Sequence, residues 1–160
     1  MVYKIAANVL SNRLKLILPE VIALNQSAFV PGRLITDNIL LAYEITHFLQ
    51  TKRYGVDDYA AVKLDMSKAY DRVEWSFLEK MMMKMGFARR WVDIIMECVT
   101  TVSYHIKING ELTQEILPGC GLRPGDPLSP YLFLICAEGF SALLNAAEAN
   151  GSLSGVKICQ

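Results

Sequence analysis

Two aspartates, Asp65 and Asp71, stand six residues apart directly behind the apolar run "YAAV". A carboxylate at the end of a buried strand is costly unless hydrogen bonds or a cation compensate it. Such an aspartate either caps the turn into the next helix or binds a divalent cation together with a nearby backbone carbonyl. Spacing alone leaves both roles open for Asp65. Asp71, just before an apolar helical stretch, fits an N-cap better than a metal ligand.

A glycine-rich stretch, "GCGLRPGDPLSP" at residues 119–130, is the second candidate for chemistry. Its glycines permit close backbone approach to a partner, and Arg123 places a cation between them. The stretch leads into a helix N-terminus, which favours anions. It is not a Walker-type loop, and an ordinary connector between a hairpin and a helix explains it equally well.

The stretch "NQSAFVPGR" at residues 25–33 is the third candidate. Its amides, Phe29 and Arg33 could contact a nucleic-acid backbone and stack on a base. The alternative is that Phe29 anchors the loop by its apolar ring and that Arg33 is a solvated charge.

The composition limits the class of protein. The chain has 160 residues, is 52% hydrophobic and has a formal net charge of zero, which indicates one ordinary folded domain and argues against a free-standing electrostatic nucleic-acid binder. No uninterrupted apolar run reaches the roughly 18 residues of a membrane helix, and the first residues do not resemble a signal peptide. We therefore expect no membrane partner and no secretion.

Cysteines and charges add two further expectations. The four cysteines form no Cys-x-x-Cys pair, so a zinc site has little support and reduced thiols are expected. Residues 1–53 hold six basic and three acidic side chains, whereas the remainder is mildly acidic. This asymmetry is compatible with a phosphate-facing lobe beside a metal-holding lobe, and also with ordinary scatter.

Periodicity and turn signals predict the elements that must position these residues. Asn109-Gly110 is a strong hairpin signal, Ser129 suits an N-cap, and Pro130 suits a first helical position. The order of elements predicts an α+β fold. Helices are predicted over residues 3–19 (stopped by Pro19), 36–52, 73–85, 88–100 and 130–150, and strands over 59–66, 102–108, 111–117 and 155–160.

Taken together, "QSAFVPGRLITDNIL", "KLDMSKAYDRVEWSFLE" and "GLRPGDPLSPYLF" closely resemble the reverse transcriptase of plant LINE-type (non-LTR) retrotransposons. The resemblance implies a partial right-hand polymerase fold, with fingers-like helices over about residues 1–56, an incomplete palm over about 57–160 and no thumb. It implies RNA-directed DNA synthesis on an RNA template with a DNA primer, using Mg²⁺ ions held by palm aspartates.

The resemblance also assigns roles to residues. Asp65 corresponds to the first catalytic, metal-binding aspartate. A nucleotide-binding role is implied for Met66 (through its carbonyl), Tyr70 (which would exclude a ribose 2'-hydroxyl), Arg123 and Gly125. A template-binding role is implied for Phe29, Gly32 and Arg33.

Three departures from the family qualify this reading. The expected pair of adjacent aspartates does not occur before Gln160, an Arg-Pro-Ile block is absent upstream of "YKIAANVL", and Pro124 stands where the family usually has glutamine. We therefore expect a truncated domain that does not polymerise DNA alone. A non-catalytic RNA-binding remnant is the alternative, and a third possibility is a fragment that is not stably folded because its sheet keeps an open edge.

Overall fold

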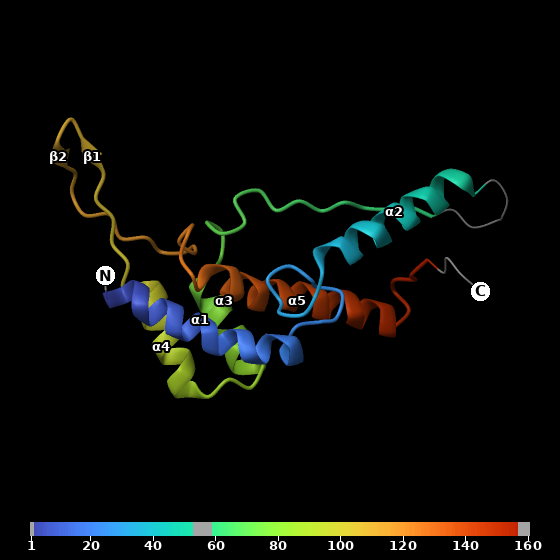
Figure 1. The fold of residues 1–160 in the computed structure, drawn as a ribbon, viewed down its shortest axis with the longest axis horizontal. Helices are drawn as coiled ribbons and strands as arrows, with labels where there is room; N and C mark the ends of the chain where they lie inside the picture. Colours follow the sequence, from blue (N-terminus) through green and yellow to red (C-terminus); the bar gives the residue numbers. More distant parts are fainter. Residues whose placement is uncertain (1, 53–58, 157–160) are drawn as a thin grey trace.

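The computed structural model describes residues 2–52 and 59–156, and Figure 1 shows its helices and its one small hairpin. The predicted α+β class is confirmed at the level of a mixture of helices and a small sheet. The predicted boundary near residue 56 lies outside the described residues. The elements are α1 (Val2–Val21), α2 (Ile35–Thr51), α3 (Trp75–Lys84), α4 (Arg89–Thr100), β1 (Lys107–Ile108), β2 (Glu111–Leu112) and α5 (Ser129–Ala149).

Four helices form the core. Helix α3 packs against α4 and α5, and α1 packs against the same two helices (Figure 1). In α1, Leu10, Leu14 and Leu18 recur every four residues, so they share one face, and that face is buried. A main core cluster gathers side chains from all four helices, and a smaller one lies beneath the loop that follows α1. These helices provide the rigid base for the candidate site.

Helix α5 is buried at its first half and exposed at its second. Leu132 and Ile135 are almost fully buried, whereas Leu143 is 69% exposed. Within the described part of the chain, α5 is the one helix long and apolar enough to cross a membrane, judged by length and composition alone. A core helix meets the same test, and the burial of its first half is that of a core helix.

Helix α2 stands apart from the core (Figure 1). Its predicted range is confirmed. The sequence also predicts that this helix packs through Ile39, Leu40, Ala42, Tyr43, Ile45, Thr46 and Leu49, and this prediction is wrong, because no residue of α2 is buried. Ile39 and Leu40 are 60% and 61% exposed. Among the described residues, no other helix or strand packs closely against α2, and its Phe48 ring contacts that of Tyr59 in the following segment, with centroids 6.1 Å apart.

The predicted strand over residues 59–66 is wrong. This segment is extended but unpaired, and Val62 and Leu64 are 78% and 68% exposed. A strand requires hydrogen bonds to a neighbouring strand, and the described part of the chain offers none here. The backbone runs as a long loop beside α2 before it reaches α3 (Figure 1).

The hairpin is present but shorter than predicted. Asn109 and Gly110 form the turn with positive φ angles of 50° and 94°, as an Asn-Gly turn requires. Only two residues on each side form ladder pairs, and Tyr104 and Ile116 add an isolated bridge. In the last predicted strand, residues 155 and 156 are not in a strand, and residues 157–160 lie outside the described part.

Three predicted helix boundaries are wrong. Helix α1 continues through Pro19 to Val21, since proline in a last turn removes only one helical hydrogen bond. Helix α5 has Leu128, not Ser129, at its N-cap, and the Ser129 hydroxyl donates instead to the Arg123 carbonyl at 2.7 Å. The N-cap of α3 is Glu74, so Asp71 does not cap that helix.

Candidate functional site

Asp65 lies on the exposed extended segment, at the edge of a cavity of about 590 Å³. The expectation of a buried carboxylate is therefore wrong. Among the described residues, the Asp65 side chain makes no hydrogen bond or ion pair, so it neither caps a turn nor is compensated by main-chain amides. The other residues lining this cavity are Met66, Ser67, Ala69, Arg72, Val73, Glu74, Phe77, Phe133, Cys136, Ala137 and Phe140.

The carboxylates near Asp65 do not complete a metal site. Within residues 2–52 and 59–156, no three acidic, histidine or cysteine side chains come together as metal ligands. Glu74 lines the same cavity as Asp65, whereas Asp71 lines a different one. The described residues therefore offer two carboxylates along one cavity, Glu74 and Asp65, the latter beside the backbone of Met66, but no cluster of three ligand side chains for a two-metal centre.

Tyr70 sits in the turn between this extended segment and α3. The turn includes Lys68 with a φ of +53°. The backbone N–H of Arg72 closes it by donating to the Lys68 carbonyl at 3.2 Å. The Tyr70 ring is half-buried against Phe133, with ring centroids 5.3 Å apart. Burial raises the pKa of the Tyr70 hydroxyl, so it remains a protonated donor at neutral pH.

The glycine-rich loop docks directly on the Tyr70 turn. Gly121 donates its N–H to the Val73 carbonyl at 2.8 Å, and Leu122 donates to the Tyr70 carbonyl at 2.9 Å. The Trp75 indole nitrogen donates to the Gly121 carbonyl at 2.8 Å. Two motifs that lie about fifty residues apart in sequence thus form one continuous structure.

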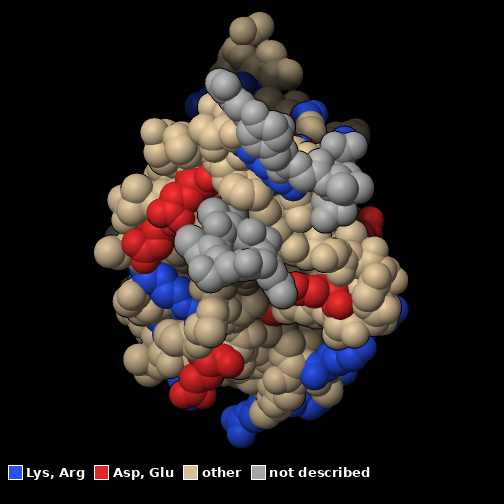
Figure 2. All heavy atoms as spheres, turned by 90° about the vertical axis from the view of Figure 1, so that its right-hand side faces the viewer, with Lys and Arg blue, Asp and Glu red and all other residues tan. Residues whose placement is uncertain are grey.

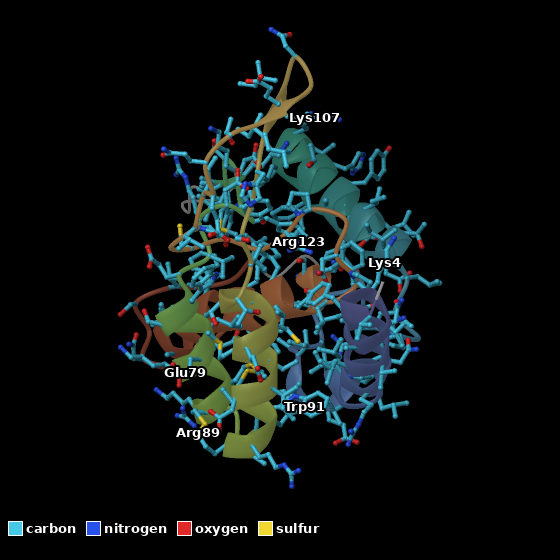
Figure 3. All side chains as sticks on the ribbon, turned by 90° about the vertical axis from the view of Figure 1, so that its left-hand side faces the viewer. Lys4, Glu79, Arg89, Trp91, Lys107 and Arg123 are labelled. Atoms are coloured by element: carbon cyan, nitrogen blue, oxygen red, sulfur yellow. The ribbon has the colours of Figure 1, made fainter. Side chains whose placement is uncertain are left out.

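Arg123 projects from this loop between the base of the hairpin and α1 (Figure 3). Its guanidinium carbon lies 5.1 Å from the Tyr3 ring centroid and 5.9 Å from that of Tyr104. The Arg123 Nε is buried without a hydrogen-bond partner among the described residues. Arg123 and both rings line a cavity of about 260 Å³, which Asp71 and Asp126 also border. Gly125 follows on the exposed side of the loop, with a φ of +78°.

Asp126 is a site residue that the sequence reasoning missed. It is only 7% exposed and accepts hydrogen bonds from the Tyr3 hydroxyl and from the Leu128 N–H, the latter at 2.9 Å. Burial, together with the nearby Asp126 carboxylate, raises the pKa of the Cys98 thiol. The one sequence feature that could have drawn attention to Asp126 was its position between a glycine and a proline, just before an apolar helix.

The three predicted template-binding residues lie in the loop after α1. Phe29 is 60% exposed with a φ of +59°, and Gly32 has a φ of +79°. The Arg33 guanidinium donates to four carbonyls, those of Pro19, Ile22, Ala23 and Gln26, at 2.5–3.1 Å. Arg33 is therefore not a solvated charge, because it closes the C-terminal end of α1. None of the three lines the two cavities described above.

Comparison with known sequences places these features in a family. The family described as "Reverse transcriptase (RNA-dependent DNA polymerase)" matches residues 1–160. A transposon TX1 uncharacterized 149 kDa protein from Xenopus laevis is 38% identical over 142 residues, which is 89% of this chain and 11% of that protein. A Pol polyprotein of the type-1 retrotransposable element R2 from Popillia japonica is 30% identical over 110 residues, 69% of this chain and 18% of the relative.

A third relative, the uncharacterized mitochondrial protein AtMg01250 from Arabidopsis thaliana, is 47% identical over 51 residues, 32% of this chain and 42% of that protein. The chain spans less than a fifth of the length of the two transposable-element proteins. The family match nevertheless runs from the first residue to the last. The chain belongs to the reverse transcriptase (RNA-dependent DNA polymerase) family.

Proposed function

We propose that this chain forms part of the reverse transcriptase domain of a non-LTR retrotransposon of the plant LINE type, and that it contributes to RNA-templated DNA synthesis. The observation that carries the proposal is the docking of the glycine-rich loop on the Tyr70 turn, with bonds of 2.8 Å and 2.9 Å. This docking joins the backbone of Tyr70 to the loop that carries Arg123 and Gly125, and the family resemblance assigns all three residues to nucleotide binding. The family match and the transposable-element relatives support it.

In this proposal Asp65 is one carboxylate ligand of Mg²⁺. Its exposed side chain has no competing hydrogen bond among the described residues, so a hydrated cation can reach it without breaking a protein contact. Because no three ligand side chains come together among the described residues, we propose that the chain alone binds a deoxynucleotide weakly and does not extend a primer. The right-hand arrangement of fingers and palm is part of the same proposal.

The proposal assigns separate tasks to Tyr70 and Arg123. The Tyr70 ring is held by Phe133 and its backbone by the loop, so it can act as a fixed wall beside a sugar. Arg123 lines its cavity, and its Nε has no hydrogen-bond partner among the described residues, so its guanidinium suits a phosphate or carbonyl oxygen of a nucleotide. Template contact through Phe29 and Gly32 completes the proposed site.

A binding experiment tests the proposal. The full chain is titrated with dTTP in the presence of Mg²⁺, with Asp65→Asn as the test variant and Asp93→Asn as its control. Asp93 is an exposed α4 carboxylate whose contact is an ion pair with Arg89, 2.8 Å away. We expect Asp65→Asn to remove the Mg²⁺-dependent part of the affinity and Asp93→Asn to leave it unchanged. Equal affinities of all three proteins would contradict the assignment.

Two further assays separate the alternatives. Primer extension with an RNA template and a DNA primer should show no incorporation by the chain alone, and incorporation that Asp65→Ala abolishes would overturn the proposed inactivity. Replacement of Tyr70 by Ala should bring the affinity for ATP closer to that for dATP, since these two nucleotides differ only in the 2'-hydroxyl. If the wild-type chain binds both equally, Tyr70 does not select the sugar.

The RNA-binding alternative has weaker structural support. Arg33 is engaged with four carbonyls, and Arg13 lies 5.0 Å from the Trp91 ring centroid. On the face shown in Figure 2, basic and acidic side chains are interspersed. A binder driven by phosphate contacts would lose affinity steeply as salt rises. RNA affinity that is insensitive both to salt and to Arg33→Ala would exclude this alternative.

A further inference from the structure

Among the described residues, Trp75 is the one side chain that donates an N–H hydrogen bond from the start of α3 to the glycine-rich loop. It is the first residue of α3, and its indole donates to the Gly121 carbonyl at 2.8 Å. The Gly121 N–H donates in turn to the Val73 carbonyl at the same distance. Both backbone groups of Gly121, its N–H and its carbonyl, are thus hydrogen-bonded to the short segment that enters α3. The sequence pattern predicts Trp75 only as a member of the helix's apolar stripe.

The backbone at Gly121 approaches the turn closely enough to disfavour any side chain at this position. Gly121 has a φ of +95°, and a Cβ there would lie 3.1 Å from the Asp71 carbonyl oxygen and 3.3 Å from its Cα. Both the conformation and the contact favour glycine. Cys120 adds a weak contact from its sulfur to the same carbonyl oxygen at 3.4 Å. The close approach places the loop within reach of the indole nitrogen.

We propose that Trp75 is a positioning residue for the nucleotide site, and this inference rests on the proposed function. Its indole holds the loop in register, so that Tyr70 on one side and Arg123 on the other keep a fixed separation. Replacing Trp75 leaves the backbone donors of Gly121 and Leu122 in place, but the Gly121 carbonyl loses its indole donor, so the docked loop opens more often. A loop that opens more often would let Arg123 leave the cavity that Trp75 also lines.

The second tryptophan of the chain provides a matched control. Trp91 lies on α4 at the side facing α1, and its ring packs beneath the Arg13 guanidinium (Figure 3). Its indole nitrogen is buried and has no hydrogen-bond partner in the described part of the chain. Replacing either tryptophan by phenylalanine keeps an aromatic ring and removes the indole N–H, but only Trp75→Phe deletes a hydrogen bond seen among the described residues.

The first measurement is amide hydrogen exchange at Gly121 and Leu122 in the full chain, followed by NMR. Both amides donate into the Tyr70 turn, so their protection reports directly on loop docking. We expect Trp75→Phe to raise both exchange rates about fivefold to tenfold, which is the change expected from one lost hydrogen bond. Trp91→Phe should leave them as in the wild type. Equal rates in the two variants would overturn the inference.

The second measurement is dTTP affinity with Mg²⁺, which a merely structural role would not change selectively. Trp75→Phe should weaken binding about fivefold, whereas Trp91→Phe should not. Faster exchange in Trp75→Phe with unchanged dTTP affinity would overturn the positioning role. If the wild-type chain does not bind dTTP, the proposed function and the nucleotide role of Trp75 both fail, and the exchange data alone decide whether Trp75 holds the loop.

Discussion

The hydroxyl of Tyr3 donates a hydrogen bond to the buried carboxylate of Asp126, across 123 residues of sequence. This contact joins the first turn of α1 to the loop that enters α5. The second oxygen of Asp126 accepts the Leu128 N–H at 2.9 Å, so the carboxylate connects the two helices. Burial and the hydrogen bond to Asp126 raise the pKa of Tyr3, which keeps its hydroxyl protonated as a donor.

Replacement of Tyr3 by phenylalanine should destabilise the chain. The change leaves a buried carboxylate with one partner fewer, which typically costs about 1–3 kcal/mol. The measurement is urea unfolding at pH 7. Tyr43→Phe on α2 is the control, because Tyr43 is 69% exposed and its ring contact is with His47. Equal midpoints for the two variants would show that the Tyr3 contact adds no stability.

Replacement of Arg33 by lysine should also destabilise the chain, by about 1–3 kcal/mol. A single ammonium cannot reproduce the planar donors that bind four carbonyls at the end of α1, where a cation also complements the helix dipole. Thermal unfolding followed by circular dichroism checks this. Arg90→Lys, at an exposed position on α4, is the matched control and should stay within about 0.5 kcal/mol of the wild type.

The predictions for helices succeeded where periodicity was strong and contacts were local. The helix over residues 88–100 was predicted almost to the residue, because Val92, Ile95 and Val99 recur on one face. Residues 59–66 have equally good strand composition, yet they remain unpaired, because a strand depends on a partner that the segment itself does not contain. Local sequence specifies a helix more completely than a strand.

In the candidate site, too, local features were predictable from the sequence and contacts with distant residues were not. The sequence motifs identified Tyr70 and the glycine-rich loop, but not the bonds that unite them, since a partner about fifty residues away leaves no local pattern. Asp126 was missed because its donor, Tyr3, lies at the other end of the chain. The sequence left two roles open for Arg33, contact with nucleic acid or exposure to solvent. In the structure the loop folds back, and Arg33 donates hydrogen bonds to carbonyls at the end of α1.

Replacement of Gly121 by alanine should cost more stability than the same change at Gly86. Both glycines have a positive φ, +95° and +87°, so both variants carry backbone strain of about 1 kcal/mol. Only at Gly121 would the new Cβ approach another backbone, at 3.1 Å from the Asp71 oxygen, whereas the space at Gly86 is open. The difference between the two urea midpoints measures the close contact. If Gly86→Ala lost more stability than Gly121→Ala, the loop around Gly121 would be able to move away from the Asp71 backbone at little cost.

The stability of the chain should fall as the pH rises above about 8.5, partly because of Cys136. Burial raises the pKa of its thiol to about 12, whereas the unfolded thiol titrates near 8.5. Between these values the unfolded state loses its proton first, so alkaline pH favours unfolding. The stabilisation is complete below about pH 8.5 and is lost progressively up to the folded pKa. From pH 8.5 to 9.5 this one thiol accounts for about 1 kcal/mol.

Urea unfolding of the wild type, Cys136→Ala and Cys120→Ala at pH 7.5, 8.5 and 9.5 checks this expectation. Cys136→Ala should reduce the loss of stability with pH, and Cys120→Ala, at an exposed position, should follow the wild type. Alkylation at pH 8 with peptide mapping gives an independent test, because only the thiolate reacts and burial suppresses it at Cys136. Modification of Cys136 as fast as Cys120 would mean that the helices around α5 open readily in solution.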